Sequence, residues 1–407
     1  KSNRRTEPKS RHPRRSFRHA SQLDLSRRSC NVKDISPTGN RAFAPSMAHD
    51  IKKIKPPSPE SFTAKQLSLF QSFLCNSDSE RDKFSNTIEL WDGVPKYFIS
   101  RQEMTKQRER GLLPTVDRDF EYRGRIFTVR VRPARLTDEE GNDKEFYPSA
   151  REELVEDALR KIAAEQHYGF LETQESGTVF TLHMLRKELQ RRGHSLSYQE
   201  VVESLDIMAG ARIEIVAADG SGDYKSPILA GLLRVSRHRY REDPKARWVA
   251  HFNPLVTRSI QALNFRQFDY HTMMSHTTQL SRWLHKRLAH NYINAHLMQP
   301  YTILFSTVQR DSGLLEYTRQ RDAIRKLDES LEELRSKGML MSFSREDRRG
   351  ERGRILDVAY TITPDPRFVS QIKAANKRQS DNIDQMETEI GAVETASPRR
   401  STGIRKR

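Results

Sequence analysis

The order of helical and strand patterns constrains this chain more than any other feature, because one order occurs twice. The clearest segment is 318–338, where apolar residues recur at the spacing of one helical face from Ile324 to Leu334 and Gly338 ends the helix. The second copy is predicted as a helix at 277–292, a shorter element at 301–313, a long helix at 318–338, and a strand hairpin at 339–344 and 355–362.

The first copy repeats this order upstream. Gly193 is a predicted C-cap, and Ser197 with Glu200 forms a capping box at the start of the next helix. The elements are helices at 148–166, 178–193 and 195–205, then strands at 211–216, 228–235 and 248–252, with a Gly/Asp-rich turn after the first strand. Three helices followed by a hairpin is the winged-helix order. We therefore predict an α+β protein with two tandem winged-helix domains, at 148–265 and 266–375.

The rest of the chain flanks these blocks. Residues 1–83 are rich in Arg, Ser and Pro, and we predict a disordered basic arm there; its first 46 residues hold 12 Lys/Arg against 3 Asp/Glu, a net of +9. Met47 is a sensible start residue, so the part before it is either native or an extension without function. We expect a strand-containing lead-in at 84–147 and a disordered polar tail at 376–407.

The charge balance narrows the class of partner. The chain has 71 Lys and Arg against 54 Asp and Glu, a net of +17, which favours a nucleic-acid partner over a merely solubilising surface. Cys30 and Cys75 are the only cysteines, so neither a disulfide framework nor a zinc site is indicated. No apolar run approaches about 18 residues, so we expect no membrane span, and the two widely spaced cysteines favour a location in a reducing cytoplasm.

The second block carries the stronger DNA-binding pattern. A winged helix places its third helix in the major groove, and the side chains facing away from the apolar stripe of 318–338 suit base and phosphate contact. On this helix the candidates are Arg319, Arg321, Asp322, Arg325 and Lys326. In the wing turn they are Arg345, Arg348, Arg349, Arg352 and Arg354. The competing interpretation is a solvated, ion-paired helix face, which the basic wing and the net charge make less favourable.

The first block is more ambiguous. Tyr198 and Gln199 begin its third helix, and Arg237 and Arg239 lie in its predicted wing. That helix also carries Glu200, Glu203 and Asp206, which DNA phosphates would repel. Dimerisation and DNA binding are therefore both open for this block.

Motifs for catalysis and cofactor binding are absent from the sequence. We find no G-x-x-x-x-G-K-[ST] loop, no H-E-x-x-H, and no His-apolar-His pair of the kind that metal-dependent nicking enzymes use. We therefore predict a protein that is not an enzyme, with no catalytic residue, metal or cofactor.

An apolar hook lies near the end of the basic arm. Residues 66–70 read Q-L-S-L-F and comprise Gln66, Leu67, Ser68, Leu69 and Phe70. Such a segment either docks in extended form into an apolar pocket of a partner or begins a helix that packs on the first domain. Together with 180–185 (F-T-L-H-M-L) and the helix-wing block at 318–363, it makes the chain resemble plasmid replication initiators of the TrfA type.

The resemblance implies a function as well as a fold. Such initiators bind repeated sites (iterons) in double-stranded plasmid origin DNA, help to open an adjacent A·T-rich segment, and recruit host proteins that include the helicase and initiator proteins. The Q-L-S-L-F segment resembles the motif by which bacterial proteins dock on the DNA polymerase sliding clamp. The family also implies an equilibrium between monomers and homodimers. The alternative is a winged-helix transcriptional regulator without a replication role.

Overall fold

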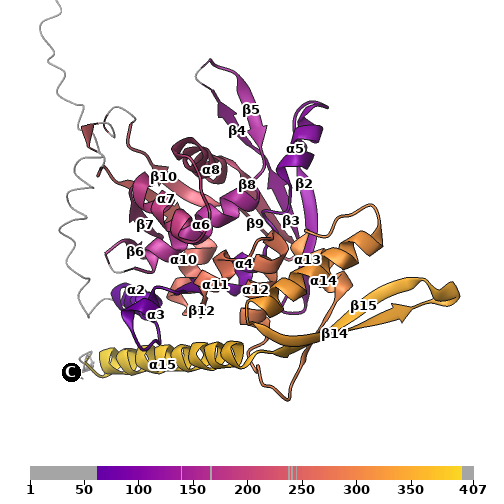
Figure 1. Cartoon of the computed structure of the whole chain (residues 1–407). Helices are drawn as coiled ribbons and strands as arrows, with labels where there is room; N and C mark the ends of the chain where they lie inside the picture. The colour runs from indigo at the N-terminus through magenta and orange to yellow at the C-terminus, as the bar shows by residue number, and fades with distance from the viewer. Residues whose placement is uncertain are drawn as a thin grey trace, which may run out of the picture. The chain divides into compact units, whose positions relative to one another are not determined.

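The computed structural model describes residues 62–396 apart from 139, 166, 237–238, 240–241 and 244, all within the unit that spans 44–407. Most of the predicted basic arm, residues 1–61, lies outside the described residues. The N-terminal part comprises α2 (Phe62–Gln71), α3 (Asp78–Arg81), β1 (Phe84–Thr87), α4 (Glu89–Gly93), α5 (Arg101–Arg108), β2 (Val116–Tyr122), β3 (Arg125–Arg132), β4 (Ala134–Thr137) and β5 (Asp143–Phe146) (Figure 1).

The first winged-helix block follows. Its elements are α6 (Ala150–Ala163), β6 (Gly169–Leu171), β7 (Ser176–Phe180), α7 (Leu182–Arg191), α8 (Tyr198–Gly210), β8 (Arg212–Ala217), β9 (Asp223–Pro227), β10 (Leu229–Leu233), β11 (Trp248–Phe252) and α10 (Pro254–Gln261). The predicted helix at 178–193 begins later than expected, because 178–180 belong to β7 and Thr181 caps α7 by accepting a hydrogen bond from the Met184 amide.

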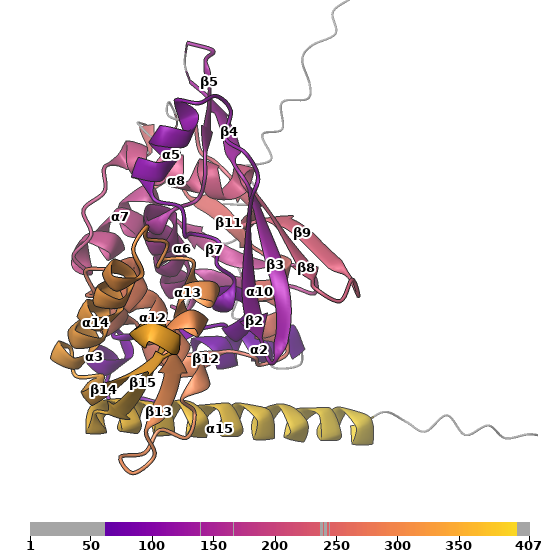
Figure 2. The ribbon, with the colours of Figure 1, turned by 90° about the vertical axis from the view of Figure 1, so that its right-hand side faces the viewer.

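The second block completes the chain. It contains β12 (Arg266–Asp269), α11 (Tyr270–Met274), α12 (Gln279–Asn291), β13 (Tyr301–Leu304), α13 (Phe305–Ser312), α14 (Gln320–Ser336), β14 (Leu340–Arg349), the 3-10 turn η1 (Glu351–Gly353), β15 (Ile355–Pro364) and α15 (Pro366–Ala396). In both views the β14–β15 hairpin projects beside α14 (Figures 1 and 2).

The sheets confirm two winged helices in series. In the second block the strand order is β13-β15-β14, so the strand before the second helix pairs with the last strand of the wing. The first block has the same order, β7-β11-β10, with β6 added at the far side of β7. The repeated order and the repeated helices define an α+β protein with tandem winged-helix domains.

The predicted strand at 211–216 has a different partner from the one we expected. β8 pairs with β9 on one side and with β3 on the other, in a four-stranded sheet β2-β3-β8-β9. Ile213 lies opposite Val131 and Ile215 opposite Val129, and all four side chains are buried. This matched alternation joins the lead-in strands to the first winged helix, so the β8–β9 hairpin is an insertion and only β10 and β11 form the wing sheet.

The predicted disordered tail is wrong over 376–396, because α15 continues to Ala396. Its inward side chains contact the first domain, where Arg378, Asn382 and Met386 are buried. Tertiary contact of this kind stabilises a helix whose sequence is mostly polar. The prediction of a disordered arm is likewise wrong from Phe62 onward, since α2 and α3 are folded helices.

Two separate apolar cores underlie the two domains. One gathers α2, α6, α7, α8 and the first sheets, and the other gathers α12, α13, α14 and the second wing sheet. The short β1–β12 ladder connects the N-terminal part to the segment between the domains, with Phe84 opposite Asp269 and Thr87 opposite Arg266.

Candidate nucleic-acid interface

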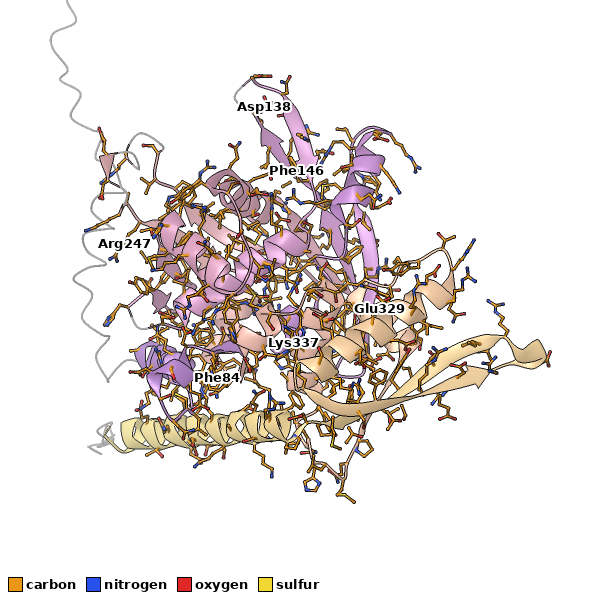
Figure 3. All side chains as sticks on the ribbon, viewed as in Figure 1. Phe84, Asp138, Phe146, Arg247, Glu329 and Lys337 are labelled. Atoms are coloured by element: carbon orange, nitrogen blue, oxygen red, sulfur yellow. The ribbon has the colours of Figure 1, made fainter. Side chains whose placement is uncertain are left out.

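Helix α14 has one apolar face and one basic face, as its sequence predicts. Ile324 and Leu327 are buried in the second core, together with the rest of the stripe. On the opposite side lie Arg319, Arg321 and Arg325, which are exposed. The side chain of Arg325 is 70% exposed to solvent. Charged side chains project outward from this helix, on which Glu329 is labelled in Figure 3. The first turns of α14 therefore present guanidinium groups to the solvent.

Neighbours within α14 restrain some of the predicted contact residues more than others. Arg325 lies 3.3 Å from Asp322 and 3.9 Å from Glu329, and Lys326 lies 3.4 Å from Glu329. Exposed pairs of this kind are worth about 0.5 kcal/mol, so DNA can displace them at low cost. Among the described residues, no ion-pair partner lies within 4.0 Å of Arg319 or Arg321.

The wing arginines fall into two groups. Arg345 lies 2.8 Å from Asp347, and Arg349 lies 2.7 Å from the same carboxylate and donates a hydrogen bond to the Gly353 carbonyl. Arg348 and Arg354 are exposed. The side chain of Arg352 lies outside what the structure describes. Asp347 thus fixes two of the predicted cations on the hairpin.

Asp328 connects the helix to the wing and was not predicted. Its carboxylate accepts a hydrogen bond from the Tyr360 hydroxyl at 2.6 Å and another from Arg345 at 3.1 Å. Burial, with the hydrogen bond to Asp328, raises the pKa of Tyr360 far above its usual range, so the hydroxyl remains a donor. Arg345 is 17 residues from Asp328 along the chain, so no local sequence pattern could have indicated this contact.

A groove lies between α14 and the wing, with a volume of about 310 Å³. It is lined by Gln320, Arg321, Ile324, Arg325, Asp328, Arg345 and Ile355. Three guanidinium groups against one carboxylate give the groove a net positive charge. A phosphate group fits this charge, and each guanidinium can donate two parallel hydrogen bonds to it.

The first block presents a smaller candidate DNA-binding surface than the second, at the start of α8. Ser197 and Glu200 form the predicted capping box at the start of α8, and Tyr198 and Gln199 are exposed there. The guanidinium of Arg186 stacks over the Tyr198 ring at 4.1 Å from its centroid. Such a stacked pair presents a cation and an aromatic edge at the helix N-terminus.

The acidic residues of α8 are less repulsive than the sequence suggests. Glu203 is 2.6 Å from Arg151 and 3.8 Å from Arg101, and Asp206 is 2.7 Å from Arg234. Three arginines from other elements therefore neutralise two of the three carboxylates, and Glu200 is occupied by the cap. Of the predicted wing residues in this block, Arg239 is exposed, and Arg237 lies outside the described residues.

The hook at 66–70 is folded rather than extended. It forms the C-terminal half of α2, where Leu69 and Phe70 are buried and Leu67 is half-buried. The Phe70 ring meets Phe265 edge-on with 5.1 Å between the ring centroids, and Gln66 donates a hydrogen bond to the Gln261 carbonyl. Of the two interpretations that the sequence left open, the structure shows the helix packed on the first domain.

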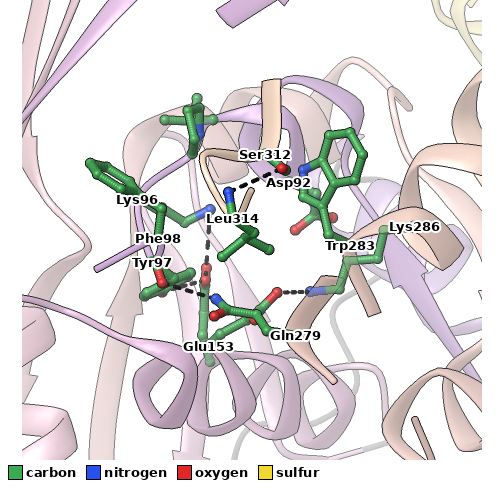
Figure 4. Close-up of a pocket in the computed structure, with 13 residues that line it drawn as sticks. Asp92, Lys96, Tyr97, Phe98, Glu153, Gln279, Trp283, Lys286, Ser312 and Leu314 are labelled. Atoms are coloured by element: carbon green, nitrogen blue, oxygen red, sulfur yellow. Dashed lines mark hydrogen bonds and ion pairs between the residues drawn. The ribbon is translucent and has the colours of Figure 1, made fainter. Parts of the chain in front are cut away.

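Buried charges fill the contact between the two winged helices. Lys286 of α12 lies 2.6 Å from Asp157 and 3.4 Å from Glu153, both on α6. Figure 4 shows the pair that Lys286 forms with Glu153. Arg160 lies 2.6 Å from Asp92 and 2.7 Å from Asp157. Burial opposes ionisation, but Arg160 and Lys286 hold the pKa of Asp92 well below its usual range. These ion pairs hold α4, α6 and α12 together and so fix the two domains to each other.

Among the residues that the structure describes, no three or more His, Cys, Asp or Glu side chains come close enough together to hold a metal ion. No helix among the described residues is long and apolar enough to span a bilayer.

Comparison with known proteins gives matches only among solved structures, since no family model and no curated protein matches. Domains 2 and 3 of RctB, as a selenomethionine derivative, match 68% of this chain and 97% of that chain, with TM-score 0.43 and 12% identity. A second structure of these RctB domains covers 65% and 99%, with TM-score 0.39 and 12% identity. The Pi initiator protein in complex with iteron DNA covers 70% and 98%, with TM-score 0.35 and 10% identity.

Proposed function

We propose that this chain binds double-stranded origin DNA as a replication initiator, with α14 in the major groove and the β14–β15 wing on the adjacent backbone. The observation that carries the proposal is the basic groove between α14 and the wing, which Arg321, Arg325 and Arg345 line. In a winged-helix complex, the DNA strand that separates the two grooves of the duplex passes between the recognition helix and the wing. The phosphates of that strand would meet Arg345 on the wing side of the groove, and Arg321 and Arg325 would face the base edges from α14.

Each part of this interface has a distinct role in the proposal. Arg319, Arg321 and Arg325 reach base edges, where arginine bonds guanine through two parallel hydrogen bonds. Arg348 and Arg354, which are exposed on the wing, bind phosphates or the minor groove without reading sequence. Asp328 fixes Arg345 at the groove through the hydrogen bond at 3.1 Å. Sequence preference thus resides in α14, and salt-dependent affinity resides mainly in the wing.

The proposal extends to the partners that the sequence resemblance implies. The target is a set of iterons in a plasmid origin, and binding promotes opening of the origin without an enzymatic step. The chain then recruits host replication proteins in the bacterial cytoplasm, including the helicase, initiator proteins and the sliding clamp, and it exchanges between monomer and homodimer. The repeated winged helix supports two DNA contacts per chain, and Q-L-S-L-F at 66–70 supports clamp docking.

Substitution of Arg325 tests the assignment of the reading helix. Duplexes selected by the wild-type protein from a random library provide the specific probe, and fluorescence anisotropy measures affinity for the selected and a scrambled duplex. Arg325→Ala should weaken specific binding by about 1–3 kcal/mol, because one bidentate base contact is lost, and it should relax the base preference at one position. Arg335→Ala is the matched control on the same helix, since Arg335 is exposed at the far end and pairs with Glu332. Equal specific affinity for Arg325→Ala and Arg335→Ala would contradict the assignment of α14.

The wing is tested through salt dependence. Arg348→Ala with Arg354→Ala should weaken binding to selected and scrambled duplexes alike, and the slope of log affinity against log salt should become shallower by about 1 per lost phosphate contact. A slope that stays the same would show that the wing does not touch the backbone.

A transcriptional regulator of the same fold remains the rival, because the basic groove suits either role. The arrangement of the selected sites separates the two. Direct repeats spaced by about one or two helical turns beside an A·T-rich segment favour the initiator, and a single palindrome favours the regulator.

A further inference from the structure

The docking segment at 66–70 packs within α2 against α10 and β6, and the C-terminal helix, which begins almost 300 residues later in the chain, makes a further contact with it. In Figures 1 and 2, α15 runs along the base of the first domain, and α2 lies against it. Met386 of α15 belongs to the same apolar core as Leu69 and Phe70, and Lys65 forms an ion pair with Glu389 at 3.0 Å. The two helices therefore share both apolar and charged contacts.

Arg378 is the centre of this contact. Its guanidinium donates hydrogen bonds to the carbonyls of Leu69 at 2.7 Å and Phe70 at 3.1 Å, and to the Asn86 side chain at 2.6 Å. It also lies over the Phe73 ring at 4.6 Å from the centroid. The last carbonyls of a helix have no partner within the helix, so Arg378 acts as the C-terminal cap of α2.

Burial of the Arg378 charge weakens the contact between α15 and α2, so this contact can be broken. Arg378 is only 4% exposed, and among the described residues no carboxylate lies within ion-pair distance of it. Its Nε atom is buried without a hydrogen-bond partner, and burial lowers the pKa of Arg378 to about 9. A buried cation that carbonyl and amide oxygens and aromatic rings surround, with no carboxylate to pair with it, reduces the net stability of the contact that contains it.

The covered side chains are the ones that a docking partner would need. An extended Q-L-S-L-F segment presents Leu67, Leu69 and Phe70 to an apolar pocket, but here Leu69 and Phe70 are 4% and 2% exposed. A helix also places these residues at spacings that an extended peptide does not have. The segment must leave α15 and unfold from α2 before it can dock.

We propose that α15 is an intramolecular cover for the docking segment, so that α15 and the partner protein compete for Leu69 and Phe70. The partner is a protein whose apolar pocket takes an extended Gln-Leu-x-Leu-Phe peptide. Its identity as the sliding clamp rests on the proposed function, whereas the cover itself rests on the contacts of Arg378. Docking is then limited by the fraction of molecules in which α2 is released.

Competition of this kind makes a quantitative prediction. The peptide 62–74 has no cover, so its dissociation constant for purified bacterial sliding clamp reports intrinsic affinity. The full chain should bind at least tenfold more weakly, and the ratio of the two constants should equal the inverse of the released fraction. Hydrogen exchange of the amides at 64–71 in the free chain measures that fraction independently.

Two variants of the full chain shift the released fraction. Arg378→Glu sets a carboxylate against the carbonyls of Leu69 and Phe70, and should raise clamp affinity about tenfold or more while exchange in α2 accelerates by the same factor. Glu389→Lys repels Lys65 at the surface and should act in the same direction with a smaller effect. Glu387→Lys, on the exposed side of α15, is the matched control and should leave both quantities unchanged.

The outcomes separate the cover from the identity of its partner. If the peptide binds the clamp, then equal clamp affinities of peptide and wild-type chain, or faster exchange in α2 without a gain in affinity, would overturn the cover. If the peptide itself does not bind the clamp, the clamp is the wrong partner. In that case the exchange data still decide whether α15 protects α2: unchanged exchange in both Arg378→Glu and Glu389→Lys would refute the cover, and faster exchange would support it. Unaltered circular dichroism and unaltered DNA binding by α14 establish that the variants are folded.

Discussion

Replacement of Lys286 by methionine should destabilise the protein strongly, although Lys286 is remote from the proposed DNA groove. The lysine is 5% exposed, and its ammonium group lies 2.6 Å from Asp157 and 3.4 Å from Glu153. Without it, Asp157 retains Arg160 at 2.7 Å, but Glu153 retains only Arg282 at 4.0 Å. The variant therefore leaves a buried carboxylate almost uncompensated.

The magnitude follows from that imbalance. Removal of one partner from a buried ion pair costs about 3–5 kcal/mol, and the residual contact to Arg160 places the expected loss near the lower end, at about 3 kcal/mol. Urea unfolding at neutral pH, followed by circular dichroism and by tryptophan fluorescence, measures the change as a lower midpoint at constant slope. Arg335→Met removes an exposed pair with Glu332 and should leave the urea midpoint unchanged.

The double variant Lys286→Met with Asp157→Leu sharpens the test. It removes the positive charge together with its nearest carboxylate, so its loss should be smaller than the sum of the two single losses. If Lys286→Met lowers the free energy of unfolding by less than about 1 kcal/mol, the charges at this contact are hydrated and the domains are not fixed by them.

Two further predictions concern pH and backbone conformation. Burial lowers the pKa of His276 and of His290 to about 4 in the folded chain, whereas the same histidines have a pKa of about 6.5 in the unfolded chain. The unfolded state binds more protons in that window, so the free energy of unfolding should fall by about 1.4 kcal/mol per pH unit for each histidine as pH drops from about 6.5 to 4; urea midpoints that stay constant from pH 6.5 to 5 would contradict this. Gly313 and Gly353 both have positive φ, but only at Gly313 would a Cβ lie 2.9 Å from Phe98. Gly353→Ala should therefore cost about 1 kcal/mol and Gly313→Ala clearly more in the same assay, and equal losses would refute the steric argument.

The elements that sequence predicts well are those whose structure depends on local periodicity. The stripe of α14 from Ile324 to Leu334 is buried as predicted, because a helix places residues three and four apart on one face. Leu182, Leu185 and Leu189 of α7 are buried at the same spacing. The repeated order of helices and strands then predicts two winged helices. The partner of β8 was not predictable in this way, because strand pairing depends on Val129 and Val131, which are more than 80 residues away.

The features of the candidate site also divide into those that local periodicity predicts and those that depend on contacts between distant elements. Exposure of Arg319, Arg321 and Arg325 follows from the helical period, whereas the contacts of Arg345 with Asp328 and of Arg234 with Asp206 join separate elements. Helix α15 was missed, and α2 was only one of two interpretations that the sequence left open, for a related reason. A segment such as 66–70 suits an extended docking peptide and a short helix equally well, and only its packing on distant residues selects the helix.

The Lys286 variant also addresses whether the first winged helix contacts DNA. The buried charges between α6 and α12 fix α8 relative to α14, and Lys286 is absent from the basic groove. If α8 and α14 bind one duplex, loosening the contact makes the second attachment less favourable, so folded Lys286→Met should bind the selected duplex more weakly than wild type while its affinity for a half-length duplex stays constant. If α14 binds alone, both affinities should equal those of the wild type, and the exposed Tyr198 and Gln199 then serve another contact, such as dimerisation. Anisotropy titrations with the two duplexes, in buffer without urea so that the variant is folded, distinguish these cases.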